Sequence, residues 1–179
     1  IANAENAASG YGLTKKIAEE LFDLGISILT LGNHSWDQRE MLSYIEECGK
    51  IIRPINYPDG VPGKGYYKIK LPDGKSILII QAMLRLFMGI SLDDPFQKVS
   101  KILSSEILGK TNNFIFIDLH GEATSEKNAF AHYFDGQVTS ILGTHTHVPT
   151  SDHRILEKGT AYQTDVGMTG DYNSVIGMD

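Results

Sequence analysis

Five side chains in this sequence have the chemistry to hold metal ions. They are Glu5, Asn33, His120, His145 and His147. Together they offer a carboxylate that can bridge two cations, a neutral amide oxygen and three imidazoles. Such mixed imidazole and oxygen ligands suit manganese, iron, zinc or cobalt better than calcium. Cys48 is the only cysteine, which argues against a thiolate site.

These ligand types would suit phosphoryl chemistry. Two metals about 3.5–4 Å apart can clamp a phosphoryl group and activate a bridging hydroxide as the nucleophile. His145 and His147 would face the same side of a regular strand, but in a turn beyond a strand they can reach two neighbouring metals. His34, next to Asn33, is free to protonate the departing oxygen as a general acid.

The candidate ligands follow apolar runs that read as buried strands. The run 26–30 precedes Asn33, the run 114–119 precedes His120, and the run 138–142 precedes His145. In open α/β folds, sites form in the crevice outside the carboxyl ends of the strands. We therefore expect three separate segments to deliver ligands to one edge of a sheet.

The remaining patterns predict an α/β architecture, because strands alternate with helices. Helices are expected at about 14–24, from a capping box at Ser35 and Gln38 to Gly49, at 94–108 and at 123–133. Hairpins are expected between 66–71 and 76–82 and around 157–159. With no internal repeat or linker, residues 1–179 are predicted to form a single domain.

Charge and hydropathy limit the classes of partner. Lys and Arg number 16 and Asp and Glu 22, a formal net charge of -6. This balance argues against a broad surface for nucleic acid or anionic membrane, but a metal pair could still attract a small phosphorylated substrate. No apolar run approaches the ~20 residues of a membrane helix, and the first residues do not look like a signal peptide. A cytoplasmic protein is expected.

Several motifs carry a resemblance to a known family. Residues 32–37, Gly-Asn-His-Ser-Trp-Asp, resemble the Gly-Asn-His-(Asp) motif of calcineurin-like metallophosphoesterases, and residues 143–147, Gly-Thr-His-Thr-His, resemble their Gly-His-Thr-His motif. More narrowly, four stretches resemble the YmdB family of bacterial phosphodiesterases: residues 5–8, 118–127, 143–148 and 164–170. They occur in order along essentially the whole chain.

The resemblance implies a fold, a reaction and roles for individual residues. The fold would be two packed β-sheets flanked by helices (α/β/β/α), and the substrate a phosphodiester, with cyclic nucleotides as the implied class. Glu5 would bridge two transition metals, with Fe or Mn favoured over Zn or Co. Asn33, His120 and His145 would complete the second metal site. His147 and Asn6 would serve the first, and His34 would be the general acid.

The sequence also departs from the family pattern. Members begin with a strand leading to a Gly-Asp motif whose aspartate binds the first metal, and nothing here precedes Ile1. We therefore interpret the chain as a fragment, incomplete at both ends, with exposed strand edges that favour self-association into homo-oligomers. Ala4 and Leu84 stand where the family has glycines, and the second change puts the approach of Arg85 to substrate in doubt.

Other interpretations remain open. The chain could be a non-catalytic metal- or nucleotide-binding module, or, with less support, a two-metal amidohydrolase. His132 and His153 are expected to be structural or solvated. One of Asp37, Asp118 and Asp165 could hold an imidazole in place, although capping and turn roles suit each of them at least as well.

Overall fold

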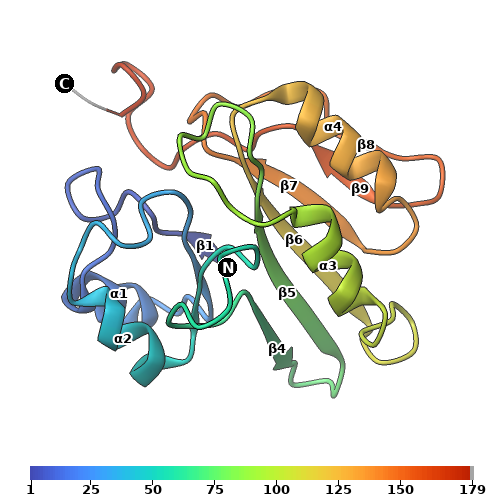
Figure 1. Ribbon diagram of the computed structural model, residues 1–179, viewed down its shortest axis with the longest axis horizontal. Helices are drawn as coiled ribbons and strands as arrows, with labels where there is room; N and C mark the ends of the chain where they lie inside the picture. The colour runs from blue at the N-terminus through green and yellow to red at the C-terminus, as the bar shows by residue number, and fades with distance from the viewer. Residues whose placement is uncertain (178–179) are drawn as a thin grey trace.

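The computed structural model describes residues 1–177 and has four layers, with two β-sheets packed between two pairs of helices (Figure 1). The smaller sheet is parallel and has the order β1-β2-β3, with strands β1 (Ala2–Asn3), β2 (Leu29–Thr30) and β3 (Ile51–Ile52). The larger sheet has the order β4-β5-β6-β7-β9-β8. Its strands are β4 (Tyr66–Lys70), β5 (Ser76–Met83), β6 (Phe114–His120), β7 (Ser140–Thr144), β8 (Arg154–Ile155) and β9 (Ala161–Gln163).

Strand β5 shows how the layers are joined. Leu78 and Ile80 pack in the core cluster that also contains Phe130 and Phe134, from α4 (Thr124–Tyr133) and its end. The alternate residue Ile79 packs against Ile28 and Ile52 of the smaller sheet region. A strand buried on both faces needs an uninterrupted apolar run, and 77–80 is such a run. The predicted α/β/β/α arrangement is confirmed.

Two predicted helices begin where expected, and each has a capping side chain. Thr14 Oγ1 accepts a hydrogen bond from Ile17 N (3.3 Å) at the start of α1 (Lys15–Asp23). Asp94 Oδ1 accepts one from Phe96 N (2.8 Å) at the start of α3 (Pro95–Leu103). Helix α3 ends earlier than the predicted residue 108. The chain there turns back, and Thr111 Oγ1 accepts from Ile107 N (2.6 Å).

The capping box predicted at Ser35 and Gln38 is wrong. Helix α2 (Met41–Cys48) begins later, with Glu40 at its N-cap, and ends at Gly49 as expected. Ser35 Oγ instead donates to Gly32 O (2.6 Å), and Gln38 Nε2 donates to Tyr11 O (2.7 Å). Both side chains are therefore used to fold residues 32–40 into a loop beyond β2.

The two predicted hairpins are present. Strand β7, which lies outside both, begins two residues later than the predicted run 138–142. Strands β4 and β5 pair antiparallel, as do β8 and β9. The shift places Gly143 inside β7, where a Cβ would lie 1.7 Å from Thr164 O. Only glycine allows the segment after β9 to cross β7 this closely.

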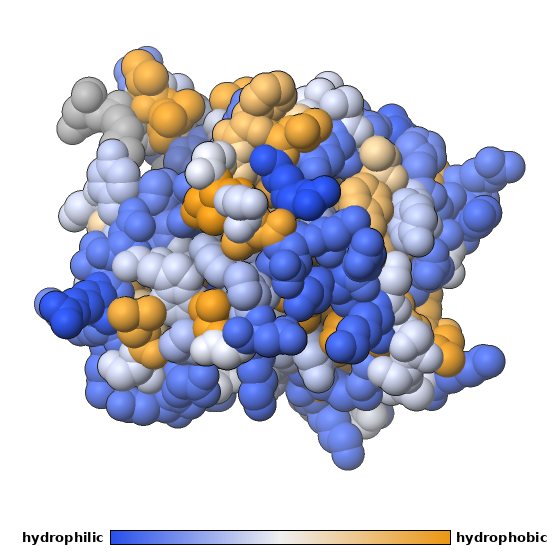
Figure 2. Space-filling view, viewed as in Figure 1, coloured by the Kyte–Doolittle hydropathy of each residue, from blue (hydrophilic) through white to orange (hydrophobic). Residues whose placement is uncertain are grey.

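The surface in Figure 2 is mostly hydrophilic, and its hydrophobic side chains gather in patches of limited extent, as on ordinary protein surfaces. Within residues 1–177, every helix is too short or too polar to cross a membrane.

Candidate metal centre

Parallel strands of both sheets end at one place, and the candidate ligands lie there. Glu5 follows β1, Asn33 follows β2, His120 is the last residue of β6, and His145 follows β7. The two sheets are joined at this edge by Asn3 Nδ2, which donates to Asp118 Oδ2 (3.1 Å). The candidate ligands therefore converge at one edge as expected, and they come from both sheets instead of one.

His120 is at the centre of the cluster. Its Nε2 lies 3.1 Å from Glu5 Oε1, 2.8 Å from Asn33 Oδ1 and 3.2 Å from His145 Nδ1. The His120 and His145 rings meet edge to face, with centroids 4.9 Å apart. Glu5 and His120 are buried, whereas His145 is half-buried. One side of the cluster is thus closed, and the other is open toward solvent.

The arrangement of these atoms fits a cation. The oxygens of Glu5 and Asn33 accept hydrogen bonds and cannot donate, and His120 Nε2 could satisfy at most one of them. Glu5, His120 and His145 each place a potential ligand atom within 4.8 Å of the others. Gly32 leaves the space between them clear, because a Cβ there would lie 2.2 Å from Glu5 Oε2 and 2.5 Å from His120 Nε2. A metal ion would relieve this crowding of lone pairs.

The electrostatics favour the ligand forms of two of these groups. Burial alone would raise the pKa of the Glu5 carboxyl, but the charge and hydrogen bond of His120 and the His34 backbone outweigh it and the net shift is downward. Burial, followed by the charge of His120, lowers the pKa of His145. Glu5 is therefore kept as a carboxylate and His145 as a neutral imidazole, the forms that bind metals.

His147 and Asn6 form a separate pair beside this cluster. His147 Nε2 lies 3.2 Å from Asn6 Oδ1, and His147 Nδ1 lies 2.8 Å from Ile176 O. Asn6 Nδ2 donates to Gly10 O (2.7 Å), which turns its Oδ1 toward His147. Because Nδ1 must donate to the Ile176 carbonyl, the lone pair of Nε2 faces another acceptor. His147 Nε2 and Asn6 Oδ1 thus form a second, smaller group of potential metal-ligand atoms.

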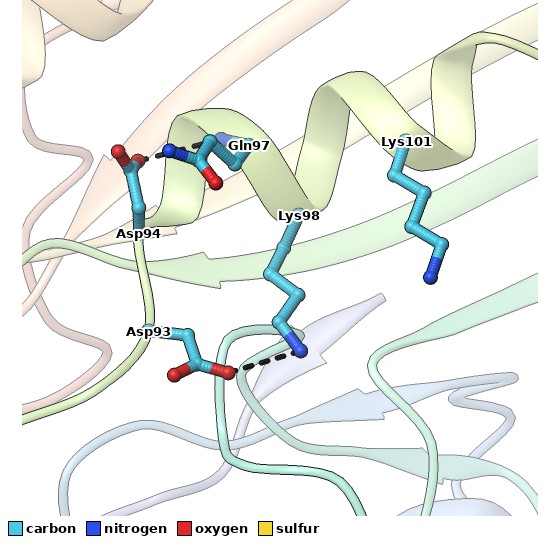
Figure 3. Close-up of a pocket in the computed structure, with 5 residues that line it drawn as sticks. All are labelled: Asp93, Asp94, Gln97, Lys98 and Lys101. Atoms are coloured by element: carbon cyan, nitrogen blue, oxygen red, sulfur yellow. Dashed lines mark hydrogen bonds and ion pairs between the residues drawn. The ribbon is translucent and has the colours of Figure 1, made fainter.

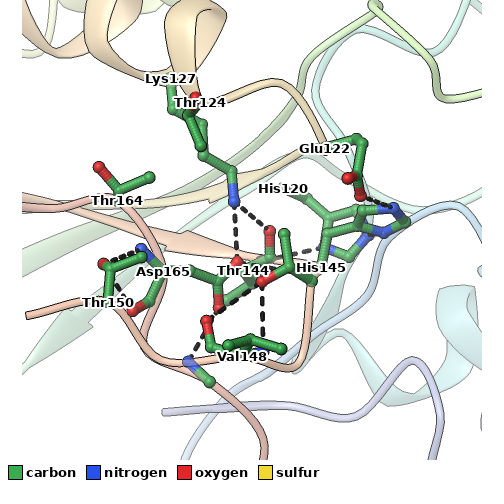
Figure 4. A network of polar contacts seen from close by, with 12 residues as sticks. His120, Glu122, Thr124, Lys127, Thr144, His145, Val148, Thr150, Thr164 and Asp165 are labelled. Carbon is green, nitrogen blue, oxygen red and sulfur yellow. Dashed lines mark hydrogen bonds and ion pairs between the residues drawn. The ribbon is translucent and has the colours of Figure 1, made fainter. Parts of the chain in front are cut away.

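The loop after β7 separates its two histidines by backbone conformation. His145 has φ of 110° and His147 has φ of 65°, values that residues other than glycine seldom adopt. Such strain persists only where the surroundings enforce it. Here Asp165 Oδ2 accepts from Thr146 N (3.2 Å), and the buried Lys127 Nζ donates to Thr144 O (3.0 Å) (Figure 4).

His34 lies at the rim of the cluster. Its backbone N–H donates to Glu5 Oε2 (3.3 Å), and its Nδ1 lies 2.7 Å from Asp37 Oδ2. Tyr11 packs against the imidazole edge to face, with ring centroids 5.3 Å apart. Asp37 thus holds Nδ1 and leaves Nε2 as the nitrogen that can exchange a proton.

The three aspartates considered as partners of an imidazole make three different contacts. Asp37 contacts an imidazole directly, Asp118 contacts the hydroxyl of Thr144 (2.7 Å), and Asp165 pairs with Lys127 (2.8 Å). His132 and His153 are exposed, in agreement with the prediction.

Sequence reasoning missed Thr144, Gly32 and Glu122 as neighbours of the ligands. Glu122 Oε2 lies 3.3 Å from His145 Nε2, within the contact network of Figure 4. The only signal for Glu122 in the sequence is its place inside the 118–127 motif. The Gly32 and Thr144 contacts depend on strands that are distant in sequence.

A hollow of about 290 Å³ lies elsewhere, at the start of α3 (Figure 3). It is lined by Asp93, Asp94, Gln97, Lys98 and Lys101. Asp94 caps the helix and Asp93 pairs with Lys98 (3.0 Å), so these charged groups serve the local structure. The hollow contains none of the predicted site residues.

The fold is that of a calcineurin-like metallophosphoesterase. A sequence model described as YmdB-like protein matches residues 1–179, and the chain belongs to this family. It is 48% identical over 179 residues to a protein of Bacillus subtilis (strain 168) named 2',3'-cyclic-nucleotide 2'-phosphodiesterase, an alignment that covers 100% of this chain and 66% of the relative.

Two crystal structures are also similar. A hypothetical protein from Thermus thermophilus is 47% identical with a TM-score of 0.90, over 98% of this chain and 67% of that one. A structure described as a novel phosphatase from Mycoplasma pneumoniae is 37% identical with a TM-score of 0.87, over 98% and 63%. The chain thus spans about two-thirds of the length of the proteins it matches.

Proposed function

We propose that this protein is a metal-dependent phosphodiesterase that hydrolyses cyclic nucleotides. The observation that carries the proposal is the meeting of the Glu5, Asn33, His120 and His145 ligand atoms at the carboxyl ends of strands from both sheets. The name of the Bacillus subtilis relative adds the substrate class, because that protein is named for 2',3'-cyclic nucleotides.

The proposed metals are two transition ions, Fe or Mn before Zn or Co. Glu5, Asn33, His120 and His145 would hold one ion, and His147 and Asn6 would contribute to the other, with Glu5 shared between them. When bound, such a pair clamps a phosphoryl group and lowers the pKa of attacking water. The ions would also offset the net charge of -6, so that a small anionic substrate can approach.

His34 would supply the proton that the leaving oxygen needs. Opening a cyclic phosphodiester releases a sugar alkoxide, a poor leaving group unless it is protonated. Asp37 accepts from His34 Nδ1, which orients the ring. Nε2 would then deliver its proton to the departing oxygen and leave a neutral ring.

The first test measures metal content and turnover on one preparation, made from the full reading frame that contains these residues and reconstituted with Mn²⁺ or Fe²⁺. We expect about two ions per chain and hydrolysis of 2',3'-cyclic AMP that is abolished by chelation. Two bound ions without turnover of any phosphodiester would overturn the enzymatic proposal. In that case the non-catalytic binding module would be the better description.

The general acid has a sharper test. We expect His34→Gln to lower kcat for 2',3'-cyclic AMP by about 10²–10⁴-fold. The loss should be much smaller for bis(p-nitrophenyl) phosphate, because p-nitrophenolate departs without a proton. Metal content should stay at the wild-type value. An equal loss for both substrates would contradict the acid role and indicate that His34 serves binding or structure.

A further inference from the structure

A hydrogen-bonded chain of three side chains connects the cluster to the interior. Thr144 Oγ1 lies 2.9 Å from His120 Nδ1 and 2.7 Å from Asp118 Oδ1. The strand register creates this contact, because Thr144 is paired with His120 between β7 and β6. Asp118 lies two residues before His120 and therefore points to the same side of β6.

Asp118, at the inner end of these hydrogen bonds, is the acceptor in each of them. Asp118 is buried, and its Oδ2 lies 2.5 Å from Thr30 Oγ1 and 3.1 Å from Asn3 Nδ2. Both neighbours are on the smaller sheet, and both donate. Burial raises the pKa of the Asp118 carboxyl, and the three donors that converge on it, with the Thr144 hydroxyl on Oδ1, oppose that shift.

The direction in which these hydrogen bonds are donated determines which nitrogen of His120 carries a proton. The Thr144 hydroxyl has one hydrogen, and that hydrogen is donated to Asp118. Thr144 Oγ1 can then only accept from His120, so Nδ1 must carry the proton. With Nδ1 committed to Thr144, Nε2 is the nitrogen that faces Glu5 and Asn33. It can donate to the Glu5 carboxylate or, once a metal ion displaces its hydrogen, bind the ion through its lone pair.

We infer that Thr144 and Asp118 are positioning residues that fix the tautomer and orientation of His120 for metal binding through Nε2. The inference rests on the proposed metal-binding role of His120. Metal-bound histidines usually donate their second nitrogen to a carboxylate or carbonyl. Here a threonine hydroxyl stands between the carboxylate and the ring.

The same carboxylate also aligns the ligand that comes from the smaller sheet. Asn3 donates to Asp118 through Nδ2, while its Oδ1 accepts from Glu5 N (3.1 Å). Asp118 therefore connects the segment that carries Glu5 with the strand that carries His120. The position of Asp118 therefore affects the distance between Glu5 and His120 as well as the tautomer of His120.

The test compares wild type with Thr144→Val, which keeps the shape of the side chain and removes the hydroxyl, and with Thr144→Ser, which keeps the hydroxyl. In the metal-free wild type labelled with ¹⁵N-histidine, NMR should show a proton on His120 Nδ1. T144V should populate the Nε2–H form and lower Mn²⁺ affinity by about 10–100-fold in calorimetry, and T144S should stay near wild type.

Several results would overturn the inference. A wild-type His120 without a proton on Nδ1 contradicts it directly, and this measurement needs no variant. Equal Mn²⁺ affinity in wild type and a folded T144V, judged by circular dichroism, contradicts it as well. If wild type has the Nδ1–H tautomer but binds no metal, the proposed function fails and the positioning of His120 serves something other than metal binding.

Discussion

The sequence predicted the role of a single residue where that role depends on residue type, and did not predict it where the role depends on contacts between distant segments. Asn33, His120 and His145 were predicted as neighbours because each follows a strand, and the family resemblance added Glu5 to them. Their atoms do meet. Thr144 could not be singled out, since its partners come from β6 and its role depends on strand register. His147 is near Asn6 and outside the Glu5 group, a division that residue types alone do not reveal.

Gly32 offers a prediction at this scale. In Gly32→Ala, the new Cβ would occupy the space between Glu5 Oε2 and His120 Nε2, at 2.2 and 2.5 Å. We expect the variant to fold and to lose at least about tenfold in Mn²⁺ affinity, because ligand atoms must move to relieve the clash. Calorimetric titration of the metal-free protein measures the affinity.

The matched control for this change is Gly170→Ala. A Cβ added there would have Met168 Sδ as its nearest neighbour, at 3.9 Å, and the backbone needs no positive φ at this position. This variant should bind Mn²⁺ as wild type does. Unchanged affinity in Gly32→Ala would mean that the gap between these atoms is not where the ion lies.

Among the helices and strands, those with strong local signals were predicted well. The caps at Thr14 and Asp94 act within one turn of the chain, so the sequence contains the whole interaction. Serine is also a favourable N-cap residue, but the Ser35 hydroxyl donates to Gly32 O, and the Gln38 amide donates to Tyr11 O. A tertiary contact overrode the local preference there. The short strands β1 and β3 are two residues long, too brief to give a periodic pattern.

The segments around β9 give a prediction about acid stability. Asp152 accepts from Thr150 Oγ1 (2.6 Å) and from Thr164 N (3.1 Å) and Oγ1. Burial opposes its ionisation, but these hydrogen bonds prevail and lower the pKa of Asp152 to about 2. In the unfolded chain the pKa is about 3.9. The stabilisation is therefore fully present above about pH 4 and is lost as pH falls toward 2.

Asp152→Asn should remove this pH dependence. We expect the variant to be less stable than wild type at neutral pH, and the difference should shrink as pH falls from about 4 to 2. Urea denaturation at a series of pH values measures both free energies of unfolding. Curves that remain parallel over this interval would show that Asp152 does not contribute through its charge.

Across the whole molecule, the site exists because two sheets are aligned at their carboxyl edges. Leu31 N donates to Gln81 Oε1 (2.9 Å), and Thr30 and Asn3 both donate to Asp118, so polar contacts cross between the layers at this edge. Periodicity predicted strands and helices, whereas the two-sheet arrangement came from the family resemblance. A strand pattern does not state which sheet a strand joins, because pairing is decided by distant segments.

Lys127 joins helix α4 to the larger sheet and gives the last prediction. From α4 it reaches Thr144 O (3.0 Å) at the end of β7 and Asp165 Oδ2 (2.8 Å) beyond β9, and both charged groups are buried (Figure 4). Lys127→Met would leave the carboxylate buried without its partner. We expect a loss of about 3–5 kcal/mol in the free energy of unfolding, measured with urea.

A double-mutant cycle separates charge from packing. Asp165→Asn removes the negative charge and keeps an oxygen that can accept from Thr146 N, which braces the turn between His145 and His147. Lys127→Met with Asp165→Asn should therefore be more stable than Lys127→Met alone, since no unpaired charge remains. If the double variant is instead as unstable as the sum of the single changes, the pair acts through packing, and the turn is held by its backbone contacts.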